Sequence, residues 1–269
     1  MRDILEDWLA EDVGKGDFTS QAVVQDTNCE AHVTGGPGIV SGIEVVKTLL
    51  NMVHVEYQTS HSDGSKIELG DIVFSLKGKS HSILKIERLL LNILCHLSGV
   101  ATATAEIVDI AKSVNPNVEI LATRKTIPGF RKFEKEAVVH GGGRTHRIRL
   151  DDAILIKDNH LKLTNSISKA ILKSKLKYPS LMVEVEADTP EQALEATKSN
   201  ADRVMLDNFT PELVKTTVSE IKTFSDIEIE ISGGVNMENI TDYAPYADFI
   251  SLSSLTMAAP PVDFSLHVI

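Results

Sequence analysis

The basic side chains between Ala122 and His160 are the strongest chemical signal in this sequence of 269 residues. This stretch holds nine Lys and Arg residues against five acids, although the whole chain has 27 basic and 38 acidic residues and a formal net charge of −11. Arg124 and Lys125 follow the apolar run VEILAT, and Lys157 follows AILI. Cations at the ends of predicted strands suit a small molecule with several negative charges. The alternative is a solvated basic face, which runs of charge usually form.

Arg147, with His146 beside it, completes this basic set. The planar guanidinium of an arginine matches a carboxylate with two parallel hydrogen bonds, so two or three such residues indicate two or more anionic groups on the ligand. Taken singly, each of these side chains could belong to a surface ion pair, which contributes under about 1 kcal/mol to stability. Their convergence favours a binding site for an anion.

Two acids follow later apolar runs in the same way. Glu186 follows LMVEV and Asp207 follows RVML, so both carboxylates are expected at the same edge as the lysines. Paired carboxylates that leave room for water are what Mg²⁺ uses when it also binds a substrate phosphate. The sequence therefore predicts a metal–phosphate site at Glu186 and Asp207. The alternative is that these acids only neutralise Lys125 and Lys157.

Small residues follow the last two runs. Ser232 and Gly233 lie in EISGGV, and Ser253 follows FISL. Barrels commonly bind a phosphate between the loops after late strands, through backbone N–H groups and a helix N-terminus. We therefore expect a phosphate subsite here. The other glycine run, residues 141–143, is expected to end the helix FRKFEKEAVVH instead.

These residues need a scaffold that brings several strand ends together. From about residue 118, short aliphatic runs alternate with helical stretches, and the runs are ILAT, AILI, LMVEV, RVML, IEIEI and FISL. Strands that alternate with helices indicate a parallel sheet. A complete eightfold barrel needs about 250 residues, and only about 150 remain from residue 118 to the end of the sequence. The expected fold class is therefore α/β, with an incomplete parallel α/β barrel as the catalytic domain over residues 105–261.

The first part of the chain, residues 1–104, is predicted to form a separate N-terminal domain. AHVTG, GIVSG, HVEYQTS and DIVFSLKG are short, alternating and bounded by turn residues, as in a small antiparallel sheet. A long helix over residues 82–112, with an apolar stripe that is expected to be core, would join this sheet to the barrel. The tail 262–269 alternates as well, so it is expected to return as a strand to the N-terminal sheet.

Bulk properties exclude several classes of protein. The net charge of −11 argues against a nucleic-acid partner, because phosphate-backbone binding needs a basic surface. No run of about 18 apolar residues occurs, which argues against a membrane span, and the start MRDILEDWLAED is acidic. Cys29 and Cys95 are too few for a disulfide framework. We expect a soluble, cytoplasmic protein.

Taken together, the motifs TRKTIPGFR, EKEAVVHGGGRTHR, LIKDNH, VEVE, MLDNF and ISGGV, in this order, resemble quinolinate phosphoribosyltransferase, the carboxylating nicotinate-nucleotide pyrophosphorylase family. EDVGKGDFTS and ERLLLNILCHLSGVATAT in the first half resemble it too, so the likeness runs nearly end to end. The resemblance implies an N-terminal open-faced α/β sandwich, an incomplete barrel, and a homodimer with shared active sites that could assemble further. It also implies transfer of phosphoribose from phosphoribosyl pyrophosphate to quinolinate with loss of CO₂, giving nicotinate mononucleotide for NAD biosynthesis.

The resemblance also assigns roles to individual residues. The two quinolinate carboxylates would be held by Arg124, His146, Arg147 and, from the partner subunit, Arg88. Lys125 and Lys157 would contact substrate anions around the reacting carbon.

The remaining assignments concern phosphoribosyl pyrophosphate. Glu186 and Asp207 would engage its ribose hydroxyls and Mg²⁺. Ser232, Gly233 and Ser253 would bind its 5′-phosphate.

Four positions depart from the family pattern: Ala122, Thr145, Arg149 and Ser253. They leave open a related molybdate-transport-associated homologue that lacks this activity. A more remote alternative is a Schiff-base aldolase that uses Lys125 or Lys157 as a desolvated amine nucleophile.

Overall fold

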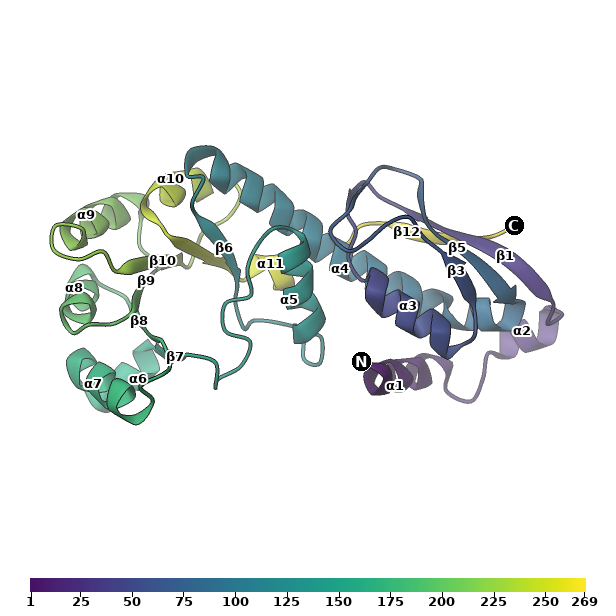
Figure 1. Cartoon of the computed structure of the whole chain (residues 1–269), viewed down its shortest axis with the longest axis horizontal. Coiled ribbons are helices and arrows are strands. Elements are labelled where there is room, and N and C mark those ends of the chain that lie inside the picture. Colours follow the sequence, from purple (N-terminus) through teal and green to yellow (C-terminus); the bar gives the residue numbers. More distant parts are fainter. The chain divides into compact units, whose positions relative to one another are not determined.

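The computed structural model describes all residues from 1 to 269, and the chain divides into two compact units (Figure 1). The N-terminal unit comprises Met1–Ala103, Val139–Gly141 and Ala259–Ile269. The barrel unit comprises Thr104–Val138 and Gly142–Ala258.

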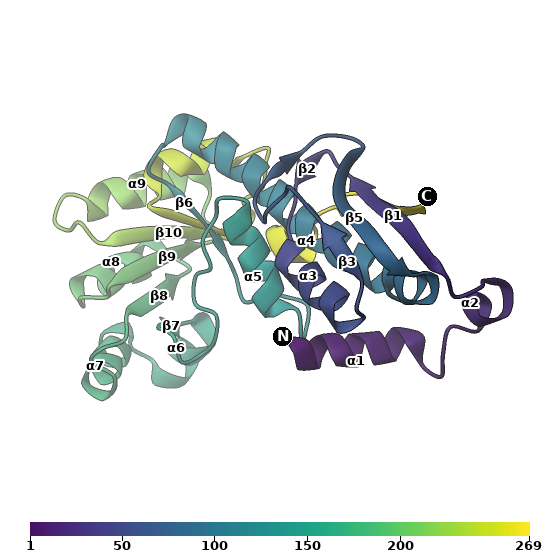
Figure 2. The ribbon, with the colours of Figure 1, turned by 45° about the vertical axis from the view of Figure 1, so that its right-hand side comes forward.

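The N-terminal unit is built on a four-stranded antiparallel sheet in the order β12-β1-β5-β3, of which Figure 2 labels β1, β5 and β3. Its strands are β1 (Asn28–Gly35), β3 (Glu56–Gln58), β5 (Asp71–Lys79) and β12 (Phe264–Val268). The C-terminal tail therefore pairs with β1, with Val33 opposite Leu266. Side chains alternate across β1, so Ala31 and Val33 are buried while Glu30 on the other face is exposed.

The other elements of this unit include two helices that the sequence did not predict. They are α1 (Arg2–Val13), α2 (Phe18–Val23), α3 (Ile43–Met52), the first part of α4 (Ser80–Val114), and the two short strands β2 (Gly38–Ile39) and β4 (Lys66–Ile67). The two unpredicted helices are α2 and α3. In α3, Ile43, Val46 and Leu50 recur at helical spacing and are fully buried.

The long helix α4 differs from one expectation. By length and composition α4 could cross a membrane, because an 18-residue window of it has a mean hydropathy of 1.4. The sequence showed no candidate span because charged and polar residues interrupt this apolar stretch. More than half of that window is buried inside the protein. Leu90, Ile93 and Leu94, from the predicted apolar stripe, are at most 1% exposed, so the stripe is core as predicted.

The barrel unit contains six parallel strands in the order β6-β11-β10-β9-β8-β7. They are β6 (Glu119–Ala122), β7 (Ile154–Ile156), β8 (Val183–Ala187), β9 (Arg203–Asp207), β10 (Glu228–Ser232) and β11 (Phe249–Leu252). Every residue of β8 is buried, as expected of a strand covered on both faces. The edge strands β6 and β7 do not pair with each other, so the barrel is incomplete, as predicted.

Helices alternate with these strands and cover the sheet (Figure 1). They are α5 (Arg131–His140), α6 (Asp158–Thr164), α7 (Ile167–Lys177), α8 (Pro190–Lys198), α9 (Pro211–Ile221), α10 (Ile240–Tyr243), a 3₁₀ turn (Ala244–Tyr246) and α11 (Ser254–Met257). The helix α5 ends just before the glycine run 141–143, as predicted, and Gly142 there has a φ of 88°.

Strand register brings the ends of the barrel strands to one level. Ser232 of β10 lies opposite both Asp207 of β9 and Ser251 of β11. Glu186 of β8 lies opposite Met205 of β9. Polar side chains from four consecutive strands therefore meet at one edge of the sheet.

Candidate active site

A cavity of about 310 Å³ opens at the carboxyl ends of the parallel strands. Its lining comes from the six strands, from the segments that follow them and from the segment between α5 and β7: Thr123, Arg124, Lys125, His146, Arg147, Leu155, Lys157, Glu186, Met205, Asp207, Glu230, Ser232 and Ser251. The predicted site residues among these are Arg124, Lys125, His146, Arg147, Lys157, Glu186, Asp207 and Ser232. The structure thus brings most of the predicted set into one cavity.

Two arginines form the cationic side of this cavity. Arg124 follows β6, and its Nε is buried without a hydrogen-bond partner. Arg147 donates from its guanidinium to the carbonyl of Ala153 at 3.3 Å. Burial and the nearby charge of Arg124 lower the pKa of Arg147. Two like charges held partly out of water cost free energy, which an anionic ligand between them would recover.

The two predicted lysines differ in their surroundings. Lys125 is exposed, and its loop is fixed because its carbonyl accepts a hydrogen bond of 2.6 Å from the hydroxyl of Thr256. Lys157 forms an ion pair with Glu186, whose side chain is only 8% exposed. The side chain of Lys157 is 44% exposed, so it is not the desolvated amine that a Schiff-base nucleophile requires.

Asp207 stands at the end of β9 and accepts a hydrogen bond of 2.6 Å from the side-chain amide of Asn208. Asn208 has a φ of 59°, and its backbone N–H donates to the carbonyl of Ser232 at 2.9 Å. The loops after β9 and β10 are therefore tied together beside the carboxylate.

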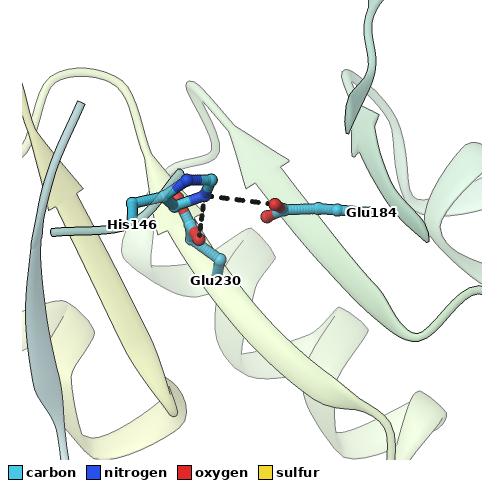
Figure 3. Close-up of side chains that lie close together, drawn as sticks. All are labelled: His146, Glu184 and Glu230. Carbon is cyan, nitrogen blue, oxygen red and sulfur yellow. Dashed lines mark hydrogen bonds and ion pairs between the residues drawn. The ribbon is translucent and has the colours of Figure 1, made fainter. Parts of the chain in front are cut away.

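His146, Glu184 and Glu230 form a triad of buried side chains (Figure 3), and His146 and Glu230 also line the cavity. The Nε2 of His146 lies 3.2 Å from Oε2 of Glu184 and 3.3 Å from Oε2 of Glu230. All three side chains are at most 7% exposed. Arg203 also bonds to Glu230 at 3.3 Å and stacks 3.7 Å from the ring centre of Phe249.

The triad determines the protonation of His146. Burial disfavours the charged imidazolium, but the bonds to Glu184 and Glu230 outweigh burial and raise the pKa of His146 to about 9. The backbone N–H of Arg147 lies 2.6 Å from Nδ1 and favours an unprotonated Nδ1. Burial and the charge of Glu230 raise the pKa of Glu184 to about 7, whereas the bond to His146 outweighs burial and lowers the pKa of Glu230. At least one full carboxylate charge therefore lies at Nε2, and we assign a charged ring at neutral pH.

The triad is also the group whose geometry could hold a metal ion. Its ligand atoms all lie within 4.8 Å of one another. Metal binding there would have to displace the Nε2 proton and compete with the cation of Arg203. Glu186 and Asp207, the predicted metal ligands, do not belong to this group, although both line the same cavity.

Three predicted site residues are not part of the lining. Gly233 directly follows Ser232 and has a φ of 79°. Ser253 directly follows β11 and precedes the short helix α11. Arg88 belongs to the N-terminal unit and is exposed on α4.

Sequence reasoning missed Glu184, Glu230 and Ser251. The signal for the two acids was present, because Glu184 and Glu230 each lie between two buried aliphatic residues of a strand, where an unpaired carboxylate is costly. An acid at such a position indicates a buried partner. No pattern in the sequence pointed to Ser251.

Comparisons with known proteins agree with this geometry. Residues 17–98 match the family model described as "Quinolinate phosphoribosyl transferase, N-terminal domain", and residues 100–267 match its C-terminal counterpart. A probable carboxylating nicotinate-nucleotide pyrophosphorylase of Archaeoglobus fulgidus is 44% identical over 88% of this chain and 93% of its own length. The carboxylating nicotinate-nucleotide pyrophosphorylase of Rattus norvegicus is 36% identical over 97% of this chain and 88% of its own.

A solved structure gives the same result at the level of the fold. The nicotinate-nucleotide pyrophosphorylase from Francisella tularensis superimposes with a TM-score of 0.94 at 35% identity, covering 100% of this chain and 95% of that one. Both family models, the relatives and the fold therefore confirm the resemblance inferred from the motifs. The chain belongs to the quinolinate phosphoribosyl transferase family.

Proposed function

We infer that this protein is a carboxylating nicotinate-nucleotide pyrophosphorylase, which makes nicotinate mononucleotide, pyrophosphate and CO₂ from quinolinate and phosphoribosyl pyrophosphate. One observation carries the inference beyond family membership. Arg124, Arg147 and Lys157 share a single cavity with the carboxylates Glu186 and Asp207, in an otherwise acidic chain. Such a site offers cations to a dicarboxylate and to phosphates, and carboxylates to a sugar or a metal.

Arg124 and Arg147 are the proposed ligands of the two quinolinate carboxylates. Each guanidinium can give parallel hydrogen bonds to one carboxylate, and the buried Nε of Arg124 has an unused donor. The Nε2 of His146 is engaged by Glu184 and Glu230, so we propose that His146 contributes its positive charge and holds Arg147 in place. Arg88 is proposed to reach this site from the partner of a homodimer.

Glu186, Asp207, Lys125 and Lys157 are the proposed contacts of phosphoribosyl pyrophosphate, with Ser232, Gly233 and Ser253 at its 5′-phosphate. Mg²⁺ fits these residues, because it typically keeps several waters and takes one or two protein carboxylates together with substrate phosphates. Glu186 and Asp207 would hold it. When bound, Mg²⁺ would neutralise charge on the departing pyrophosphate.

The proposed reaction begins as the bond between ribose C1 and pyrophosphate breaks and the pyridine nitrogen bonds to C1. Lys125 and Lys157 stabilise the negative charge that the leaving group gains. Arg124 and Arg147 orient the ring so that its nitrogen faces C1. The bond from the C2 carboxylate to the ring then breaks, CO₂ leaves, and the electron pair left on C2 takes a proton from solvent.

Location and assembly follow as further proposals. The buried stripe of α4 is that of a core helix, and the acidic surface charge suits a soluble protein. We propose a cytoplasmic homodimer in which the N-terminal unit and the barrel unit act as separate domains.

The direct test is an assay of the purified protein with quinolinate, phosphoribosyl pyrophosphate and Mg²⁺, following nicotinate mononucleotide and CO₂, with nicotinate as the control substrate. We expect product from quinolinate and none from nicotinate. A folded protein that makes no product would instead favour a homologue that binds a different anion.

A further inference from the structure

Lys135 is a fully buried lysine outside the cavity lining. It lies on α5, and the whole residue is 1% exposed. Its ammonium donates to the carbonyl of Ala122 at 2.9 Å, to that of Arg147 at 2.8 Å, and to that of Thr145. An ammonium has three donors, so each of its protons is used on a backbone oxygen.

These three carbonyls belong to the two segments that supply the arginines of the site. Ala122 ends β6 and leads through Thr123 to Arg124. The carbonyls of Thr145 and Arg147 lie on either side of His146. One buried cation therefore joins the segment of Arg124 to the segment of Arg147 through backbone hydrogen bonds.

Keeping a charge at this position is unfavourable for the folded protein. Burial, and then the charges of Arg131 and Arg124, lower the pKa of Lys135 to about 8. A lysine that served packing alone could be replaced by an apolar residue with apolar neighbours at lower cost. Unfavourable local energy of this kind is typical of residues that hold a functional site in a required geometry.

The segment held by Lys135 has a second anchor, the ring of His146 (Figure 3). His146 has a φ of 46°, which is rare for a residue with a side chain, and its ring is fixed by Glu184 and Glu230. Lys135 holds the backbone before and after this residue. The two anchors together fix the direction in which Arg147 leaves the chain.

We propose that Lys135 is a positioning residue that sets the spacing between Arg124 and Arg147, and so the affinity for an aromatic dicarboxylate. The inference rests on the proposed function, because it assumes that these two arginines bind the carboxylates. A positioning role predicts a loss confined to one substrate. A merely structural role predicts less folded protein, and therefore a lower apparent kcat with unchanged KM values.

The test is steady-state kinetics of Lys135→Met, with quinolinate and phosphoribosyl pyrophosphate varied separately. Methionine has a similar length but no donors. We expect the quinolinate KM to rise at least about tenfold, because a misplacement of about 1 Å can cost up to about 100-fold. The phosphoribosyl pyrophosphate KM should change far less. Lys132→Met on the same helix is the matched control, because Lys132 is exposed and pairs only loosely with Glu136 at 3.9 Å.

Two further variants keep the test decisive. Lys135→Gln retains two donors and should give a quinolinate KM between wild type and the Met variant; it carries the test if the Met variant does not fold. Arg147→Ala probes the proposed function itself. If Arg147→Ala raises the quinolinate KM but neither Lys135 variant does, the positioning role is overturned. If Arg147→Ala leaves that KM unchanged, the proposed binding roles fail instead.

Discussion

Gly233 and Asn208 approach so closely that a Cβ on Gly233 would lie 2.2 Å from the Oδ1 of Asn208. Asn208 in turn bonds to Asp207 at 2.6 Å and to the carbonyl of Ser232 at 2.9 Å. Asn208 therefore connects the proposed phosphate loop to the proposed metal ligand Asp207. Only glycine fits at position 233, beside Asn208.

Gly233→Ala is expected to weaken binding of phosphoribosyl pyrophosphate at least about tenfold, because Asn208 must move and its bond to Asp207 is then lost. The matched control is Gly234→Ala. Gly234 also has a positive φ, of 70°, but a Cβ added there would have no other heavy atom within 4 Å. Equal KM values for the two variants would show that backbone strain alone accounts for the loss.

Glu186→Gln removes the negative charge that pairs with Lys157. We expect kcat/KM for phosphoribosyl pyrophosphate to fall by about tenfold or more, since a charged hydrogen bond contributes about 1.5 to 3 kcal/mol. The quinolinate KM should hardly change. Steady-state kinetics at two Mg²⁺ concentrations separate the roles, because a lost metal ligand would be partly compensated at the higher concentration. A quinolinate-specific defect would contradict the assignment.

Arg124→Met removes one of two like charges that face each other in the cavity. The variant should therefore unfold at the same or a slightly higher temperature than wild type, while its quinolinate KM rises about 10- to 100-fold. Thermal unfolding without ligand and a kinetic assay measure the two effects independently. A variant that loses stability in step with activity would instead assign Arg124 a structural role.

The His146 triad predicts a pH dependence of stability. Because the folded-state pKa of about 9 exceeds the ordinary 6.5, the charged ring stabilises the fold fully below pH 6.5, and this contribution is lost as pH rises to about 9. His146→Asn cannot titrate. The difference in unfolding free energy between wild type and His146→Asn should therefore shrink between pH 6.5 and 9. A difference that grows with pH would contradict a charged histidine.

Shared active sites predict complementation between two inactive variants. Arg88→Ala and Lys125→Ala should each have little activity alone. When equal amounts of the two variants are unfolded and refolded together, about half of the dimers contain one copy of each variant. Each mixed dimer has one intact site of two, so the mixture should regain about a quarter of wild-type activity. No recovery, in a mixture shown to form mixed dimers, would place both residues in the site of one subunit.

Local pattern was enough to predict much of this protein. Each barrel run was predicted from its aliphatic character, and the cavity brings together Arg124, Lys157, Glu186 and Asp207 as their positions after these runs implied. The reason is that a parallel sheet places all carboxyl ends at one edge, whatever the packing above it. The motifs likewise determined the family, since they are short contiguous stretches.

Only the tertiary structure decided which buried side chains contact the segments at that edge of the sheet. His146 meets Glu184 and Glu230 across gaps of 38 and 84 positions, and Lys135 meets Ala122 and Arg147 from a separate helix. Strand register and the placement of α5 create these contacts, so no local periodicity encodes them. The sequence by itself thus determined most of the charged residues that line the cavity, whereas the fold decided which buried charges lie behind them, because burial changes the energy of a charge only once its neighbours are fixed.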